Sequence, residues 1–233
     1  SSRVPACTAT KILDRKSVYT ILQTIPSSGR VFGQVMHDER SDTPRGAGKS
    51  SFELIEAGKL FQILALKPGY TTLDMGCGTG MYTFAMAEIV GEGGRVHAVD
   101  LWAEGIQRLR ERIERRGVKN VRPIVADLGK PLPLPAESQD LILMATVLHD
   151  LKEAGLQDGA LAEARRLLKR YGTFAVVEFT KTSGTPGPPV SLRLSPGEVE
   201  SLVTPFGFRR TGLHGIGPYN YLMTFVPKLA CNA

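Results

Sequence analysis

The chain has 233 residues, a length that fits one α/β domain or such a domain with a modest extension. Apolar residues make up 42% of it, enough for a full core, and 29 basic against 23 acidic residues give a net charge of +6. This mild excess permits an acidic partner without demanding one, and the lack of a dense Lys/Arg run with interleaved aromatic residues disfavours a nucleic-acid-binding protein.

Cysteine usage and hydropathy narrow the class further. The chain has three cysteines, Cys7, Cys77 and Cys231, an odd number without the spacing of metal ligands. We therefore expect a reduced, cytoplasmic protein without a metal site. No apolar run reaches the length of a transmembrane helix, and we therefore expect no membrane span.

Residues 1–48 carry the weakest pattern in the chain. The first 35 residues hold five Lys or Arg against one Asp, a composition similar to that of a transit peptide, but no clean amphipathic period accompanies it. We therefore expect an N-terminal extension that wraps the surface. The stretch from Gly46 to Ser50 is not a phosphate-binding loop, because the earlier glycine position is Thr43 and no strand precedes it.

A helix is expected next. Ser50 or Ser51 is a suitable cap for a helix that runs to about Leu66. Apolar residues recur there at helical spacing, which places Leu54, Ala57, Phe61 and Leu64 on the buried face.

A strand, a glycine-rich turn and a helix follow, with Tyr70 to Leu73 as the strand and Met81 to Val90 as the helix. The turn carries glycines at alternate positions, which let the backbone bend sharply and approach a bound molecule. The dinucleotide fingerprint G-x-G-x-x-G does not fit, because the third glycine comes one residue early. Asp74, just before the turn, is a poor neighbour for a pyrophosphate but a good one for ammonium and sulfonium charges.

At Asp74 to Gly80 the sequence resembles the class I S-adenosylmethionine-dependent methyltransferases, whose first motif is an acidic residue followed by G-x-G-x-G. The resemblance covers about residues 50–226. In this family a helix just before the first strand often closes over the cofactor, which would bring Lys49 or Phe52 to the pocket.

A second acid, Asp100, ends the next expected strand about twenty residues beyond the glycines, where a carboxylate can accept both ribose hydroxyls. The resemblance makes Leu101 and Trp102 apolar neighbours of the adenine. Trp102 could equally pack on the helix expected from about Ala103 to Arg116. The arginines of that helix alternate with Glu111 and Glu114, which is typical of a solvated face.

The third strand, Val121 to Ala126, leads to Asp127 and Leu128, and an acid at this place in the resembling family hydrogen-bonds the adenine amino group. The fourth strand, Asp140 to Ala145, is almost continuously apolar, which is typical of a central parallel strand buried on both faces.

His149 follows the fourth strand, at the sheet edge where open α/β folds present their catalytic groups. The Leu-His-Asp run resembles that of small-molecule O-methyltransferases, in which the histidine deprotonates the acceptor hydroxyl. A pocket wall is the alternative role. The segment after Met144 lacks the residues of enzymes that methylate exocyclic base amines, which disfavours nucleic-acid base methylation.

The remaining elements are a helix from about Leu156, a turn at 169–172, a fifth strand from Thr173 to Phe179, an irregular substrate lid at 182–190, and a helix opened by a Ser195–Glu198 capping box. Two strands within 211–226 are expected to form an antiparallel hairpin. Glu178, at the end of the fifth strand, could orient a substrate, pair with a base or form a simple salt bridge.

The sequence thus predicts a doubly wound, mostly parallel seven-stranded sheet with an antiparallel C-terminal hairpin over residues 49–228. The resemblance implies methyl transfer from S-adenosylmethionine to a small-molecule acceptor, a hydroxyl oxygen first, with nitrogen or carbon open. An NAD(P)-dependent oxidoreductase and a non-catalytic S-adenosylmethionine-binding protein are the alternatives. The implied catalytic residue is His149, and the implied cofactor-binding residues are Asp74, Gly76, Cys77, Gly78, Gly80, Asp100, Leu101, Trp102, Asp127, Leu128 and Met144. Neither the acceptor nor the oligomeric state follows from the sequence.

Overall fold

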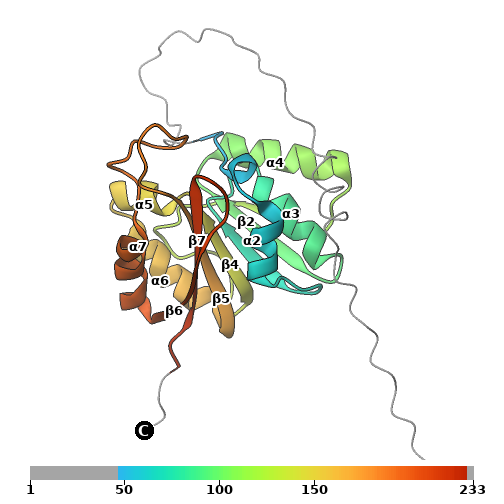
Figure 1. Cartoon of the computed structure of the whole chain (residues 1–233). Coiled ribbons are helices and arrows are strands. Elements are labelled where there is room, and N and C mark those ends of the chain that lie inside the picture. The colour runs from blue at the N-terminus through green and yellow to red at the C-terminus, as the bar shows by residue number, and fades with distance from the viewer. Residues whose placement is uncertain (1–46, 230–233) are drawn as a thin grey trace, which may run out of the picture. The chain divides into compact units, whose positions relative to one another are not determined.

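The computed structural model describes residues 47–229 (Figure 1). These residues all belong to the second of the two units into which the chain divides, which begins at Asp42. The extension predicted for residues 1–48 therefore lies almost wholly outside the described residues, and the domain boundary at 48/49 stays a prediction.

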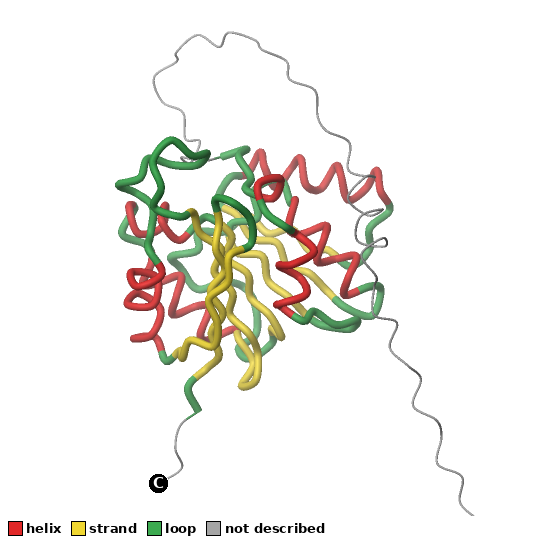
Figure 2. Tube along the Cα trace, in the orientation of Figure 1, coloured by secondary structure: helices red, strands yellow, loops and turns green. Residues whose placement is uncertain are grey.

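One seven-stranded sheet forms the centre of the described part of the chain, drawn in yellow in Figure 2. Its spatial order is β3-β2-β1-β4-β5-β7-β6, with the first five strands parallel and β7 antiparallel to both neighbours. The predicted fold class is confirmed. The strands are β1 Thr71–Met75, β2 Arg95–Asp100, β3 Val121–Val125, β4 Gln139–Ala145, β5 Leu168–Phe179, β6 Phe208–Gly215 and β7 Asn220–Pro227.

Helices cover both faces of this sheet, with α2, α3 and α4 on one side and α5, α6 and α7 on the other (Figure 1). The α-helices are α2 Ala57–Leu64, α3 Met81–Val90, α4 Ala103–Arg116, α5 Leu148–Glu153, α6 Gln157–Leu167 and α7 Pro196–Val203, with 3₁₀ turns η1 Phe52–Leu54 and η2 Thr204–Phe206. None of the helices within 47–229 combines the length and the apolar character that crossing a membrane requires.

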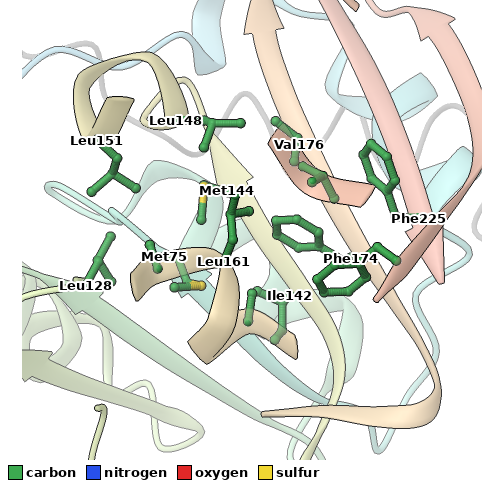
Figure 3. Close-up of a cluster of buried hydrophobic side chains, with 14 of the residues drawn as sticks. Met75, Leu128, Ile142, Met144, Leu148, Leu151, Leu161, Phe174, Val176 and Phe225 are labelled. Carbon is green, nitrogen blue, oxygen red and sulfur yellow. The ribbon is translucent and has the colours of Figure 1, made fainter. Parts of the chain in front are cut away.

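The core lies between β4, β5 and the helices of the second face. Ile142 and Met144 of β4 are fully buried, as the continuous apolar run predicts for a strand covered on both faces. Leu161 of α6 and Phe174 of β5 pack in the same cluster (Figure 3). At roughly 1.5–3 kcal/mol for each large buried side chain, this cluster supplies a major part of the stabilisation that holds the sheet edge in place.

The helix predicted for about 50–66 is wrong in its first half. The chain forms η1, passes through an extended Ile55, and begins α2 only at Ala57. The Glu56 N–H donates to the Ile216 carbonyl at 2.7 Å, and a long-range contact therefore takes the backbone group that a continuous helix would use. The buried face of α2 is consequently Ala57, Leu60 and Leu64, whereas Leu54 and Phe61 are half-buried.

The turn predicted at 169–172 is also wrong, because β5 begins directly at Leu168. The ladder pairs Gln139 with Leu168 and then Leu141 with Thr173, so the residues between them form a bulge in the strand. The capping box of α7 is confirmed, with the Ser195 hydroxyl accepting from the Glu198 N–H. The predicted hairpin is confirmed as well, although β6 starts at Phe208.

Candidate functional site

The carboxyl ends of β1 to β4 meet at one edge of the sheet, where a cavity of about 470 Å³ opens. This volume lies in the range of small-molecule sites, roughly 300–1,000 Å³. The predicted site residues that line it are Gly76, Cys77, Gly78, Asp100, Leu101, Trp102, Asp127 and Leu128. Asp74, Gly80, Met144 and His149 are buried close to this edge and are not among the lining residues.

The glycine turn owes its shape to left-handed backbone conformations. Gly76, Gly78 and Gly80 have φ values of 82°, 52° and 86°, which residues with a Cβ rarely adopt. A Cβ on Gly76 would lie 2.7 Å from Cγ2 of Val147, whereas one on Gly78 would meet no atom within 4 Å. The turn therefore packs tightly on one side and leaves open space at Gly78, beside the first turn of α3.

Asp100 is held by the backbone on both oxygens. The Gly78 N–H donates to Oδ2 at 2.7 Å, and the Trp102 N–H donates to Oδ1 at 2.8 Å. Each carboxylate oxygen keeps a further lone pair. Because Asp100 lines the cavity, these lone pairs suit a pair of ligand hydroxyls.

Trp102 both lines the cavity and packs on a helix. Its ring is 7% exposed, with the Arg108 guanidinium 5.2 Å from its centroid and Gly105 of α4 against its edge. Gly48, at the start of the described residues, also lies against this ring. The two roles left open for Trp102 are thus compatible, and stacking on adenine stays a prediction. Leu101 is 53% exposed.

Asp127 lines the cavity next to the β3 end of the sheet. Its Oδ1 accepts from the Gly129 N–H at 2.9 Å, and Lys130 lies 3.4 Å from Oδ2. The same loop buries Leu128 against the core.

Asp74 is a carboxyl group enclosed by the fold, with 1% of its surface exposed. The Thr83 hydroxyl donates to Oδ2 at 2.6 Å, and Oδ1 has no hydrogen-bond partner within the described residues. Burial raises the pKa of Asp74 to about 7; the Thr83 hydroxyl opposes this shift, and the charge of Asp100 adds to it.

His149, at the start of α5, is 5% exposed and faces β5. Its Nδ1 lies 3.0 and 2.9 Å from the two carboxylate oxygens of Glu178, which is fully buried. A carboxylate only accepts, so Nδ1 carries a proton. Nε2 lies 3.6 Å from Oδ1 of Asp150, which lines the cavity.

Burial alone lowers the pKa of His149. The hydrogen bond and charge of Glu178, with smaller contributions from Asp150 and Glu153, outweigh it and raise the pKa above the ordinary value. The result is a carboxylate–imidazole–carboxylate chain from the core to the cavity wall. Glu178 therefore pairs with His149, one of the roles that the sequence left open.

A cluster of hydroxyl groups lies at the cavity, whose lining includes Tyr82 and Thr146. The Ser51 hydroxyl lies 2.9 Å from the Tyr82 hydroxyl and 3.1 Å from that of Thr146. Burial raises the pKa of Tyr82, so the phenol stays neutral. Thr146, which lines the cavity, has φ 55°, a left-handed conformation that is strained for a β-branched residue.

Sequence reasoning missed part of the lining. Further parts of the lining come from residues 47–50, Tyr82 and the segment from Ala145 to Val147. Residues of α5 and of the turn after it, among them Asp150 and Glu153, also line the cavity. Of these, Lys49 and the segment that follows the fourth strand had been expected at this edge, and Phe52 instead stacks edge-on against Tyr82. The loop 182–190, expected as a lid, contributes no residue to the lining. Helical spacing after His149 is the signal that could have revealed α5.

The residues at this edge fit the expected cofactor. The open space at Gly78 admits a ligand close to the backbone, and Asp100 offers acceptors for ribose hydroxyls. The unpartnered Oδ1 of Asp74 is an acceptor beneath the turn for a cationic group. Within the described residues, no group of three His, Cys, Asp or Glu could hold a metal ion.

Comparisons with known proteins point to one family. A family model described as a methyltransferase domain matches residues 66–195. The chain is similar to a SAM-dependent methyltransferase of Aquifex aeolicus of known structure, with 30% identity, a TM-score of 0.70, and coverage of 76% of this chain and 92% of that one. A structure from Sulfolobus solfataricus described as a type 11 methyltransferase, 21% identical with a TM-score of 0.64, supports the fold alone.

Two curated relatives share part of the sequence. Protein-L-isoaspartate O-methyltransferase of Ignicoccus hospitalis is 30% identical over 62% of this chain and 69% of its own length. The ubiquinone/menaquinone biosynthesis C-methyltransferase UbiE of Paraburkholderia phymatum is 31% identical over 64% of this chain and 66% of its own. Against the UbiE protein of Paraburkholderia xenovorans, the chain spans about half the relative's length, 51%.

Proposed function

Because the chain belongs to the S-adenosylmethionine-dependent methyltransferases, we propose that it methylates a small molecule that carries an ionisable hydroxyl group. The observation that carries this proposal is the Glu178–His149–Asp150 chain, which leads from the core to the wall of the cavity. S-adenosylmethionine, the cofactor of this family, supplies a methyl group on a sulfonium centre. The nicotinamide-dependent alternative does not agree with the family.

The cofactor would lie across the carboxyl ends of the strands in their sheet order. Asp127 and Leu128 after β3, with Trp102, would hold the adenine, and Asp100 at the end of β2 would hold the ribose. The glycine turn after β1 and the residues after β4 would then border the methionine part. This placement uses residues that line a single cavity, and it keeps the reacting end beside Thr146 and Asp150.

The acceptor hydroxyl would lose its proton to the Asp150–His149 pair. Asp150 is the member that lines the cavity, whereas His149 does not line it and has its Nε2 3.6 Å from Oδ1 of Asp150. Glu178 holds Nδ1–H and stabilises the imidazolium that forms when Nε2 takes up the proton. The raised pKa of His149 makes the neutral imidazole a stronger base, and transfer should therefore speed up as the pH rises and the neutral form is populated. His149 thus acts as the base without forming the wall itself.

Oxygen is the first candidate for the methylated atom, and carbon is the second. Removing a proton from a phenol or enol places negative charge on the oxygen and on the adjacent conjugated carbons, so one proton acceptor serves both outcomes. Carbon is favoured by the UbiE relatives, which are named as C-methyltransferases. The position of the transferred methyl in the product, determined by NMR, separates the two.

An acceptor screen with isotopically labelled S-adenosylmethionine tests the proposal. We expect transfer to phenols, hydroquinones or enols, and none to amines or to carboxylic acids, which are already ionised at neutral pH. Transfer only to acceptors that lack an ionisable hydroxyl would contradict the proposal.

The His149→Gln variant tests the proton acceptor. We expect kcat to fall by roughly 10²–10⁴-fold, the usual contribution of a general base, while affinity for S-adenosylhomocysteine is retained. His214→Gln on β6 is the matched control and should keep the wild-type rate, because His214 is half-buried on the hairpin and does not line the cavity. An unchanged rate in His149→Gln would remove the general-base assignment.

A further inference from the structure

The described lining of the cavity contains a single cation. Lys49 is the only Lys or Arg among these lining residues, and the other charged groups of the lining are carboxylates. The Lys49 ammonium forms no ion pair within residues 47–229. It would repel the sulfonium and ammonium groups of the cofactor. A ligand group that uses Lys49 is therefore anionic.

The segment that carries Lys49 is anchored on both sides of this residue. Gly48 lies against the ring of Trp102, which follows β2. Ser51 is 2% exposed, and its hydroxyl lies 3.1 Å from the Thr146 hydroxyl after β4. Lys49 thus belongs to a short stretch of chain that runs between the ends of two strands, and its backbone is held at the cavity.

Hydroxyl donors accompany this cation. Ser50 lines the cavity, and its Oγ accepts from the Phe52 N–H at 3.2 Å, which leaves the Ser50 proton free to donate. The cluster of Ser51, Tyr82 and Thr146 has three hydroxyl protons but only two hydrogen bonds among its members.

The third proton of this cluster is available to a ligand. Ser51 is buried, and an unpaired proton there is costly, so Ser51 donates to one neighbour and accepts from the other. The proton left over then belongs to Tyr82 or Thr146, both of which line the cavity. Burial raises the pKa of Tyr82, so the phenol keeps its proton. An ammonium and two hydroxyl donors, without a free carboxylate between them in the chain, suit an anion.

The carboxylate of the cofactor has donors of its own. The first N–H groups of α3 lack partners within the helix, and Thr79 and Met81 at this helix start line the cavity. Lys49 and Ser50 are instead exposed, on the solvent side of the cavity, where an acceptor enters. Their donors are thus left for the second substrate.

We propose that Lys49 selects acceptors that carry a carboxylate in addition to the hydroxyl that is methylated. The carboxylate binds the Lys49 ammonium and the neighbouring hydroxyl donors, while the acceptor hydroxyl lies at Asp150. Thr146 and Asp150 are four residues apart, about one helical turn, so a small acceptor can reach both. The inference rests on the proposed function for the hydroxyl and adds the charge of the acceptor.

The test is calorimetric titration of the full chain, saturated with S-adenosylhomocysteine, with matched pairs of acceptors. The probes are 4-hydroxyphenylacetate and 3-(4-hydroxyphenyl)propanoate, each beside its primary amide, which has a similar shape and no charge. We expect the acids to bind about tenfold more tightly than the amides, the lower end for a charge-assisted hydrogen bond because Lys49 is exposed. High salt should reduce this preference.

A panel in which no acid binds more tightly than its amide would overturn the proposal. Because this titration involves no turnover, its result is separate from that of the methyl-transfer screen. Binding that favours the acids without transfer to their hydroxyl groups would contradict the proposed function and leave the carboxylate site in place.

Three variants assign the preference to Lys49. Lys49→Met keeps an apolar stem without the charge and should abolish the preference for acids, with affinity for S-adenosylhomocysteine unchanged. Lys49→Arg should retain the preference. Lys59→Met, on the exposed side of α2 and outside the lining, is the matched control and should behave as the wild type. A preference that persists in Lys49→Met contradicts the assignment, and so does a loss of S-adenosylhomocysteine affinity alone, which would give Lys49 to the cofactor carboxylate.

Discussion

Asp74 and Asp100 are the same residue type in opposite environments. Asp100 lines the cavity and accepts two backbone N–H groups, which hold both of its oxygens in place. Asp74 is enclosed by the fold, which disfavours its charged form, and only the Thr83 hydroxyl among the described side chains donates to it. The two acids therefore differ in character: Asp100 offers a fixed pair of acceptors to hydroxyl groups, whereas Asp74 is a buried carboxyl whose pKa burial raises to about 7.

Asp100→Ala should weaken the binding of S-adenosylhomocysteine by roughly 1.5–3 kcal/mol, because the bonds lost involve a charged acceptor. Calorimetric titration at neutral pH measures the change. Asp158→Ala, on the exposed first turn of α6, is the control and should bind as the wild type does. Wild-type affinity in Asp100→Ala would show that this carboxylate does not hold the ribose.

Among the elements, the loop 180–190 has contacts that differ from those expected of a substrate lid. Arg193, 3% exposed, donates through its guanidinium to the carbonyl oxygens of Thr180, Thr182, Thr185, Pro186 and Pro188 and to the Thr185 hydroxyl. Lys181 adds an ion pair to Glu198 on α7 at 2.7 Å. One buried cation thus satisfies the carbonyls of an irregular segment, which fits a fixed brace better than a moving cover.

Arg193→Met should lower the free energy of unfolding by about 2–5 kcal/mol, because several buried carbonyls lose their donor at once. Urea denaturation measures this, and limited proteolysis should show new cleavage within 180–190. Affinity for S-adenosylhomocysteine should be retained, since the loop 182–190 does not line the cavity. Arg110→Met on the exposed face of α4 is the control. Wild-type stability in Arg193→Met would rule out the brace.

At the scale of the whole molecule, buried ionisable groups link stability to pH. The pKa values of Asp74 and His149 are raised in the folded protein, so folding favours their protonated forms. Their stabilisation is complete below the unfolded pKa and is lost as the pH rises through the folded one. That window runs from about 4 to about 7 for Asp74, and from about 6.5 upward for His149.

The melting temperature of the free protein should therefore fall between about pH 6.5 and pH 8.5, where both groups act in the same direction. His97, whose pKa burial lowers, acts in the opposite direction only below about pH 6.5. Thermal unfolding across this range measures the effect, and Asp74→Asn should be stabilised relative to the wild type by a margin that grows up to about pH 7. A melting temperature that rises across the range would contradict this balance.

Local signals in the sequence were enough to predict most of the helices and strands of the fold. Met81–Val90 and Ala103–Arg116 occur with the predicted bounds, and the second strand ends at Asp100 as predicted. Their signals act within a few residues of one another: glycines that accept positive φ, a turn before a strand and a helical apolar period. The cofactor was implied by the family resemblance, which itself rests on short stretches of sequence: the acids and glycines at the ends of consecutive strands.

Tertiary contacts decided what local signals could not. The break before α2 comes from the bond between Glu56 and Ile216, and the course of β5 comes from its bulged pairing with β4. His149 turns toward Glu178, 29 residues further along the chain, which leaves Asp150 on the cavity wall. Burial of Asp74 likewise depends on the packing of neighbouring strands and α3. Each of these depends on partners brought together only by folding, and a buried polar group takes its properties from such partners.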